Sequence, residues 1–458
     1  MSANATAAPR IAVKLIQIKE RAKAGAIGGR ADSRVYTMPE FLERRYDHRA
    51  RLYFAALTLF LNVFVDCAGA LYSGSLVSRL LFPAAPLWSI VAVLAGAAGL
   101  YTMLGGLRAV MYTESVQAVL LLVGAMTIAV TAFARAGGWH AVMTGVDPAA
   151  LSLIRPIGDP GVPWPGLLFG IPVLGFYYWC TNQFIVQRVL SAKSLDHGRW
   201  GALFAGLLKL PVLFLMVLPG TCAILLFPHL AHADMVYPAL MFNLLPTGLL
   251  GLVAAGFVAA TMASVASTLN SAATMITMDV AKRMAPGLSE SQVVGVGRIS
   301  TVGLLLVAVL WAPQLAHFPS LWQYLQGVLA YAVPPIVALF VVGLFWRGAN
   351  AAGAAATLLI GSLSGLGLFL ANTALHWTHL HFLYVAPLLL AIDTAILVSA
   401  SLLTRRRSAD AGDDALTWTP AFFQAENLRL RSMPLWRDYR IHAVVLLVLT
   451  TCVVVVFR

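Results

Sequence analysis

The sequence predicts an all-α polytopic membrane protein, and three observations support that prediction. The chain has 458 residues, of which 60% are hydrophobic and only 11% are charged. A soluble globular chain carries about 25% charged residues. Apolar segments reach the length of roughly 20 residues that a spanning helix needs. Lys and Arg gather in alternate connections between these segments. The lipid bilayer is therefore the solvent in which this chain is expected to fold.

About eleven segments are long and apolar enough to predict transmembrane helices. They divide the chain into a basic N-terminal arm (1–52), a transmembrane core (53–404), a loop (405–438) and a terminal transmembrane helix (439–458). The eleven segments lie at residues 53–78, 87–105, 113–134, 164–184, 201–227, 247–276, 295–316, 321–346, 351–374, 382–404 and 439–457.

Basic residues predict the orientation of the chain. They are frequent in the arm and in the 405–438 loop, and the connections between carry them alternately. The positive-inside rule then places the N-terminus in the cytoplasm and, after an odd number of spans, the C-terminus outside. The net charge of +12 indicates topology rather than a nucleic-acid partner. No eukaryotic sorting signal is visible, so we expect a bacterial inner membrane. Residues 11–23 (IAVKLIQIKERAK) fit either a basic amphipathic helix on the membrane or a non-native leader.

The sequence does not present an enzyme site. The four cysteines lie in apolar segments without CxxC spacing, which excludes an evident disulfide framework or zinc site. The motif HWTHLH at 376–381 is better explained as a solvated or interfacial cluster than as a metal site. Paired carboxylates and Ser/His arrangements are not evident either. We therefore expect a protein that is not an enzyme.

The segment 321–346 is predicted to be a broken helix. It contains Gln326 and the pair Pro334–Pro335. Proline removes backbone donors and clashes with the preceding turn, so the helix should kink near residues 331–335. Broken helices in transporters expose backbone dipoles to substrates and ions. A kink without a ligand role is the alternative.

Small and hydroxylic residues recur on one face of the segment 247–276. Their spacing of four, three, four and three residues is that of a helix. Such a face lets a neighbouring helix approach closely. It could also hold a hard cation, which prefers oxygen ligands. The sequence alone leaves both interpretations open. The residues are Ala260, Ser264, Ser267, Ser271 and Thr274.

Three ionisable residues lie within apolar segments, namely Asp66, Lys209 and Asp393. Such a group costs at least about 2.5–3.5 kcal/mol at the centre of a bilayer. Lys209 is some eight residues into its predicted helix, so its side chain either snorkels to the cytoplasmic surface or faces a cavity. For Asp66 and Asp393 we expect structural pairing.

Several stretches resemble the solute:sodium symporters, and within them the sodium/glucose cotransporter branch. These stretches run in order along residues 36–404, and together they are specific. The resemblance implies a five-plus-five inverted-repeat (LeuT-like) fold and secondary active transport driven by sodium. The stretches are TMPEFLERRY (37–46), GGLRAVMYTESVQ (105–117), YYWCTNQFIVQRVLSAKSL (177–195), LKLPVLFLMVLPG (208–220), ASVASTLNSAATMITMD (263–279), LWQYLQG (321–327), PPIVALF (334–340) and FWRGANAAGA (345–354).

The resemblance also implies site residues. Lys209 and Gln326 fall where the family binds sugar, and Tyr178 falls at the aromatic residue that closes the inner side of the sugar site. Trp179 and Gln183 are in the same motif and are expected to shape the cavity. The implied sodium site comprises Ala260, which would offer its carbonyl, Ala263 and Ser264.

This sequence departs from the family pattern at three places. Ala263 stands where a second sodium-ligating Ser is usual, and Gly175 where sugar transporters have Asn or Thr. Each change removes one polar contact, which affects affinity or selectivity rather than class. The family branch usually has fourteen spans, whereas about eleven are predicted here. We therefore expect a partial fold without the first three helices, in a truncated symporter.

The sequence thus predicts sodium-coupled uptake of a small polar solute, with a sugar or polyol expected and with truncation expected to impair it. Sodium is the coupling ion, and no other metal is expected. The alternative is a non-transporting, symporter-like membrane sensor or an inactive fragment.

Overall fold

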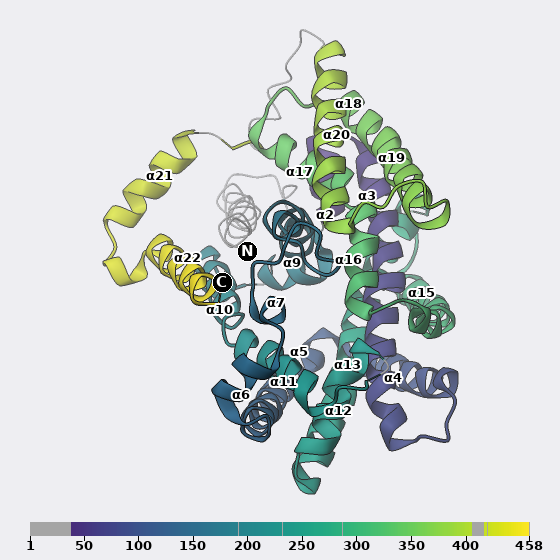
Figure 1. Cartoon of the computed structure of the whole chain (residues 1–458). Coiled ribbons are helices and arrows are strands. Elements are labelled where there is room, and N and C mark those ends of the chain that lie inside the picture. The colour runs from purple at the N-terminus through teal and green to yellow at the C-terminus, as the bar shows by residue number, and fades with distance from the viewer. Residues whose placement is uncertain are drawn as a thin grey trace. The chain divides into compact units, whose positions relative to one another are not determined.

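A computed structural model describes residues 38–457, apart from 191, 231, 286, 405–415 and 419. Most of the predicted N-terminal arm and part of the predicted 405–438 loop lie outside these residues. Helices make up the architecture (Figure 1), and the one β-bridge that the described residues form joins Arg155 and Pro163. The predicted all-α class is therefore confirmed.

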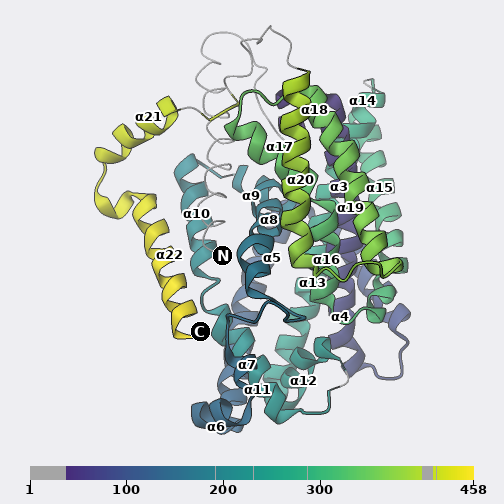
Figure 2. The same ribbon diagram turned by 45° about the horizontal axis from the view of Figure 1, so that its top comes forward.

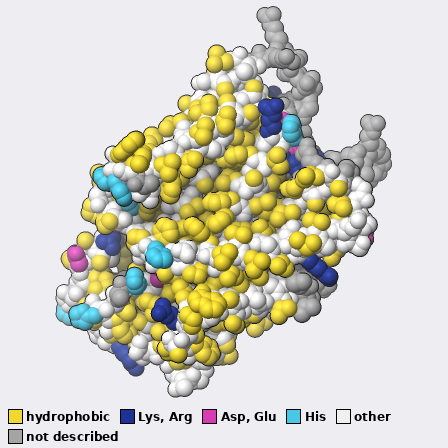
Figure 3. Space-filling model, turned by 90° about the vertical axis from the view of Figure 1, so that its right-hand side faces the viewer, with side chains coloured by type: hydrophobic (Ala, Val, Ile, Leu, Met, Phe, Trp, Pro, Cys, Tyr) yellow, Lys and Arg dark blue, Asp and Glu magenta, His cyan; other side chains and the backbone are white. Residues whose placement is uncertain are grey.

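The described chain has seven helices long and apolar enough to cross a membrane, or eight if one bent pair counts as a single span. Three shorter apolar helices, Leu87–Leu100, Gly166–Thr181 and Leu213–Leu226, occupy predicted spans as well. Hydrophobic side chains predominate on the face drawn in Figure 3, where charged ones are few. The protein is therefore a multi-pass membrane protein.

The chain divides into two compact units, each assembled from separate segments. Unit 1 consists of residues up to Leu57, Ile154–Leu208 and residues from Gln326 onward, and unit 2 consists of Thr58–Leu153 and Lys209–Leu325. The chain therefore passes between the units four times.

Unit 1 is built around helices from its three segments. Phe340 of α17 stacks on Phe41 of α2 with ring centroids 5.5 Å apart, and Phe54 of α3 meets the same ring edge-on at 5.7 Å. In Figure 2, α22 runs beside α10 and α20 beside α18. The elements are α2 (Met38–Arg45), the start of α3 (His48–Leu61), η3 (Gly166–Gly170), α8 (Ile171–Phe176), η4 (Tyr177–Thr181), α9 (Gln183–Leu190), α10 (Leu195–Leu207), the end of α16 (Leu321–Ala332), α17 (Pro334–Phe345), α18 (Ala351–Ala356), η9 (Thr357–Gly361), α19 (Ser362–Phe369), η10 (Leu370–Ala374), α20 (Phe382–Leu403), α21 (Pro420–Arg431), η12 (Leu435–Arg437) and α22 (Tyr439–Val456).

Unit 2 has its core between α4, α5, α11, α12 and α13. Buried side chains there include Val77, Ile128, Cys222, Leu240 and Val253. The elements are the end of α3, η2 (Asn62–Cys67), α4 (Ala68–Leu81), α5 (Leu87–Arg135), α6 (Gly138–Gly145), α7 (Pro148–Leu151), η5 (Leu213–Val217), α11 (Leu218–Leu226), η6 (Ala233–Met235), α12 (Val236–Leu244), α13 (Thr247–Met275), η7 (Ile276–Ala281), α14 (Lys282–Met284), α15 (Glu290–Trp311), η8 (Ala312–His317) and the start of α16.

Local sequence explains where several helices begin. The Asp47 carboxylate accepts hydrogen bonds from the N–H groups of Arg49 and Ala50 at the start of α3. Ser289 and Gln292 form a reciprocal capping box at the start of α15. Both arrangements satisfy backbone donors that the first turn of a helix leaves unpaired.

One predicted boundary is wrong. The spans 87–105 and 113–134 are joined in the single helix α5, whose backbone stays helical through Gly105 and Gly106. Glycine costs a helix only about 1 kcal/mol relative to alanine, whereas proline costs about 3 kcal/mol. The two glycines therefore lower the stability of α5 slightly but do not end it.

Candidate functional site

The motif that follows the apolar run of residues 166–176 forms a π-helical turn, η4. The N–H of Asn182 donates to the carbonyl of Tyr177 at 2.9 Å, five residues back, and Asn182 is extended, which ends the turn. Tyr177 is buried. Tyr178 is half-buried and meets the ring of Trp179 edge-on at 5.5 Å, while Trp179 is 38% exposed. Tyr178 and Trp179 therefore form an accessible aromatic pair on unit 1.

Gln183 holds the following helix in place. Its side chain is buried, and its Oε1 accepts a hydrogen bond from the N–H of Met38 at 3.0 Å. The contact joins the first residue of α9 to the first residue of α2. Because this oxygen is already used, the structure gives Gln183 a supporting position beside the aromatic pair rather than an open one.

Lys209 does not lie inside a continuous helix. The predicted span 201–227 is interrupted after α10, and Lys209 lies with an exposed side chain in the turn that precedes η5. Pro211 explains the interruption, since it disfavours helical backbone in the residue before it and begins helices well. The N–H groups of Phe214 and Leu215 both donate to the Pro211 carbonyl, so the next helix starts there. The expected position eight residues into a helix was therefore wrong.

Gln326 lies half-buried on α16, the first half of the broken span. The Asp234 carboxylate fixes the start of α16, since its two oxygens lie 3.1 and 3.0 Å from the N–H of Leu321. Tyr324 fixes the middle, because its hydroxyl donates to the carbonyl of Phe64 at 2.7 Å and accepts from the indole N–H of Trp311 at 2.8 Å.

The predicted break near residues 331–335 is present. The helices α16 and α17 meet at Val333 with a bend of 55°. Pro334 and Pro335 begin α17 and lack the N–H groups that would continue α16. Gln326 therefore stands about two turns before the bend.

The proposed sodium residues lie on α13 in unit 2. Ala263 is buried, whereas Ala260 is half-buried and the hydroxyl-bearing Ser264 is exposed. α13 also packs closely against a neighbouring helix, through the residue next to Ala260. Thr261 lies so close to Gly74 of α4 that a methyl group on that glycine would come within 2.6 Å of it. Both uses of this face that the sequence left open are therefore compatible with α13.

Sequence reasoning placed Ser267 and Ser271 on a face of α13 that could hold a cation, but it missed Glu114 of α5, which forms a polar cluster with Ser267. The Ser267 hydroxyl donates to Oε1 of Glu114 at 3.2 Å. Ser271 Oγ and Gln117 Oε1 are buried without a hydrogen-bond partner among the described residues. The available signal was the acidic residue Glu114 at the start of an apolar segment, three residues before Gln117. The cluster consists of oxygen atoms, which are the ligands that a hard cation prefers.

The site residues fall on both units. Tyr178, Trp179, Gln183 and Gln326 belong to unit 1, whereas Lys209 and the three α13 residues belong to unit 2. Lys209 and Gln326 are each the first residue after the chain crosses from one unit to the other.

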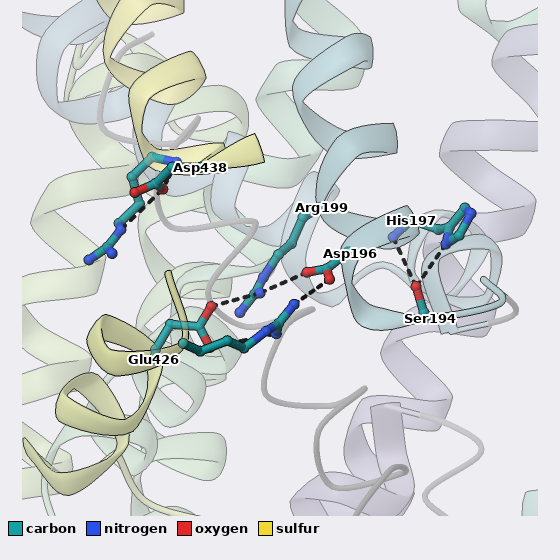
Figure 4. Close-up of polar contacts among 8 residues, drawn as sticks. Ser194, Asp196, His197, Arg199, Glu426 and Asp438 are labelled. Carbon is teal, nitrogen blue, oxygen red and sulfur yellow. Dashed lines mark hydrogen bonds and ion pairs between the residues drawn. The ribbon is translucent and has the colours of Figure 1, made fainter. Parts of the chain in front are cut away.

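An ion-pair cluster holds α10, the helix before the Lys209 turn (Figure 4). The Arg199 side chain is 1% exposed and lies 3.1 Å from Asp196 Oδ1 and 2.9 Å from Glu426 Oε1 of α21. Arg429 pairs with Asp196, and the Arg199 guanidinium lies 4.4 Å from the Tyr439 ring of α22. The C-terminal helices are therefore attached to α10 by charge.

The loop before η3 contacts the histidine motif. His381 Nε2 lies 3.1 Å from the Pro160 carbonyl, and its Nδ1 accepts from the N–H of Leu383 at the start of α20. The N–H groups of Val162 and Gly161 donate to Asp159 at 2.8 Å each, and with Arg155 nearby they hold the pKa of that carboxyl below its usual value. Among the described residues, no group of three His, Cys, Asp or Glu could hold a metal ion.

Comparison with known proteins identifies the family. A sequence model of the sodium:solute symporter family matches residues 26–361. The sodium/myo-inositol cotransporter 2 of Oryctolagus cuniculus is 36% identical over 434 residues, covering 84% of this chain and 64% of that protein. The sodium/mannose cotransporter of Bos taurus is 33% identical over 443 residues, covering 85% and 73%. The sodium/glucose cotransporter 4 of Danio rerio is 32% identical over 420 residues, covering 81% and 64%.

The chain aligns with only part of the length of several of these relatives. The chain spans 64% of the length of the rabbit protein and 55% of the sodium/myo-inositol cotransporter 2 of Mus musculus.

A solved structure shares the fold. A Na+-coupled sialic acid symporter in a substrate-bound outward-open state superposes with a TM-score of 0.68 at 20% identity, covering 88% of this chain and 85% of that one. This match confirms the predicted LeuT-like fold. Together with the family match, it establishes that the chain belongs to the sodium:solute symporter family.

Proposed function

We propose that this protein carries out sodium-coupled symport of a small polyol or sugar. The observation that carries the proposal is the identity of 32–36% to proteins named sodium/myo-inositol and sodium/glucose cotransporters. The family match at residues 26–361 also includes every proposed site residue. A transport function, rather than an enzymatic one, is the function that these relatives favour.

Sodium is the proposed coupling ion, and α13 supplies ligands for it. The Ser264 hydroxyl is accessible, and Ala260 lies one turn earlier, where its carbonyl could complete part of a ligand set. Ala263 contributes a methyl group that cannot bind a cation. The contact between Glu114 of α5 and Ser267 of α13 offers a second oxygen cluster beside the same helix. Hydroxyl, carbonyl and carboxylate oxygens fit a hard cation.

The proposed solute contacts use polar groups suited to hydroxyl-rich molecules. The Lys209 ammonium carries three hydrogen-bond donors, and the Gln326 amide carries both donors and an acceptor. The Tyr178–Trp179 pair provides apolar ring surface, and Tyr178 is proposed to close the inner side. Sodium and solute are coupled because each favours the same conformation of the protein.

We further propose that the protein lies in the cell inner membrane with a cytoplasmic N-terminus. The ion-pair cluster around Arg199 would then face the cytoplasm. Cysteine-accessibility labelling of single-cysteine variants at Lys193 and Trp377 tests this orientation, and labelling of both from the same side would contradict it.

The transport proposal is tested in proteoliposomes that contain the purified full chain. Uptake of labelled myo-inositol, glucose and mannose is measured with an inward sodium gradient and with choline in its place. We expect uptake of at least one solute to require sodium. Equal uptake in both salts contradicts coupling, and no uptake of any solute contradicts transport.

Two variants of α13 separate ion binding from helix packing. Ser264→Ala should raise the sodium concentration for half-maximal uptake several-fold, because a ligand is lost. Thr274→Ala is the matched control, since the Thr274 hydroxyl already donates to the Asn270 carbonyl of its own helix at 2.8 Å. An equal effect of both variants would contradict the assignment of Ser264.

A further inference from the structure

A buried carboxyl group lies in the middle of a membrane-spanning helix of unit 1. Asp393 is on α20, and its exposed fraction is 0%. Both of its carboxyl oxygens are buried without a hydrogen-bond partner among the described residues. The structural pairing expected for Asp393 is therefore not found within this part of the chain.

The atoms identified close to the Asp393 carboxyl are carbon atoms rather than hydrogen-bond donors. A methyl group added at Gly361 would fall 2.1 Å from Asp393 Oδ1 and 3.1 Å from Cγ of Pro335, so the carboxyl and the proline ring both lie close to this glycine. The elements that pack most closely on α20 are α17, α18, η3, η9 and α8. None of them carries an ionisable side chain.

The hydroxyl groups of Tyr53 and Ser362 are already engaged. Tyr53 is the titratable residue that interacts electrostatically with Asp393. Its hydroxyl lies 2.7 Å from Ser362 Oγ, and Ser362 Oγ donates to the Leu358 carbonyl. Ser362 uses its single proton in that second bond, so Tyr53 must donate in the first. No hydroxyl proton of this pair remains for Asp393.

An ionised carboxylate only accepts hydrogen bonds, so at this position nothing would stabilise its charge. Burying an unpaired charge is so unfavourable that the group is neutralised instead. Sodium would need several oxygen ligands, whereas Gly361 and Pro335 present carbon atoms. A proton converts the carboxylate into a neutral acid that can itself donate.

The position also connects this carboxyl to the bent span. Pro335, which also lies close to Gly361, is the second residue of α17, directly after the 55° bend. Four residues after Gly361, a methyl group at Gly365 would come within 2.4 Å of the Tyr331 carbonyl, just before the bend. Gly361 at the end of η9 and Gly365 on α19 therefore allow this segment to lie close to both sides of the bend, with Asp393 beside it.

We propose that Asp393 is a proton-binding site of this protein, occupied in the present conformation and emptied when the bend at Val333 moves. The ligand is a proton in addition to any coupling cation. A change at the bend that admits water to the carboxyl releases the proton, and closing the bend requires its return. This site does not depend on the proposed transport function.

Infrared spectroscopy of the purified full chain in lipid tests occupancy directly. A neutral carboxylic acid has a carbonyl stretching band distinct from that of a carboxylate. At neutral pH the wild type should show this band, and Asp393→Asn should lose intensity from it. Glu426→Gln is the control, because it removes a carboxyl that is ion-paired with Arg199. An unchanged band in Asp393→Asn overturns the proposal.

Thermal unfolding of the same proteins in detergent provides an independent readout. The folded protein holds a proton on Asp393 that the unfolded chain releases, so stability is greatest at low pH and falls as the pH rises. Between about pH 5 and about pH 8, the unfolding temperature of the wild type should fall relative to that of Asp393→Asn. Parallel curves for the two proteins overturn the proposal, whatever the protein transports.

Discussion

Replacing Arg45 with methionine should lower the free energy of unfolding of unit 1 substantially. The Arg45 side chain is buried and donates three hydrogen bonds to backbone carbonyls at the end of α17 and just after it. Nε donates to Gly343 at 2.8 Å, Nη1 to Ala349 at 3.0 Å and Nη2 to Trp346 at 3.0 Å. The last carbonyls of a helix have no partner within it, so Arg45 satisfies groups that would otherwise be unpaired.

The magnitude follows from these three acceptors. Each buried group left without a partner costs about 1–3 kcal/mol. Water can reach the partly buried Trp346 end, so the expected total lies in the lower half of the sum, at about 3–5 kcal/mol. Arg45→Lys should recover only part of this loss, because one ammonium group cannot reproduce the planar fork of the guanidinium.

Arg44→Met is the matched control at the neighbouring position. Arg44 pairs with Glu40, but the side chains are 32% and 19% exposed, so the expected loss is under about 1 kcal/mol. Unfolding is followed in detergent by reaction of a thiol-specific fluorophore with Cys180, which is buried in unit 1, in a variant in which Cys67, Cys222 and Cys452 are replaced. If Arg45→Met is as stable as Arg44→Met, the reasoning fails.

Three further predictions concern the other polar clusters. Arg199→Leu leaves Glu426, whose side chain is 12% exposed, without its buried partner, and should lower the free energy of unfolding by about 3 kcal/mol in denaturant. Adding Glu426→Gln should restore part of this loss, and no recovery would show that the two residues are not coupled. Because the pKa of Asp159 is lower in the folded state than in the unfolded chain, its carboxylate stabilises the fold at pH values above the pKa of the unfolded chain. The wild type should therefore have a higher unfolding temperature than Asp159→Asn at about pH 7 and lose that advantage as the pH falls to about 3. A constant difference across this range would contradict the assignment. Glu114→Gln keeps the contact with Ser267 but removes the charge, and should raise the sodium requirement of uptake several-fold, whereas an unchanged requirement would exclude the cluster from ion binding.

The sequence predicted what depends on local composition. Long apolar runs predicted the helices, and the pair Pro334–Pro335 predicted the bend found at Val333. It did not predict outcomes where local preferences are weak or opposed. Two glycines did not end α5, while Pro211 ended α10 before Lys209 and moved that residue into a turn.

Contacts between distant segments were beyond the reach of sequence patterns. Gln183 binds the backbone of Met38, 145 residues away, and Ser267 binds Glu114 across 153 residues. Nothing in the local sequence names these partners. The resemblance to a family located Gln183 in a site motif, but it did not reveal that the amide oxygen is used by the protein itself.

The division of unit 1 among three segments has a consequence for biosynthesis. Arg45 and the carbonyl of Gly343 are 298 residues apart. At a ribosomal rate of about 5–20 residues per second, Arg45 waits about 15–60 s before its acceptors are synthesised. Unit 2 ends at Leu325, so all of its residues emerge before the last segment of unit 1 does. The newborn protein must therefore keep a cationic side chain without these three acceptors until Ala349 has been made. Its two units are completed in the reverse of the order in which they begin.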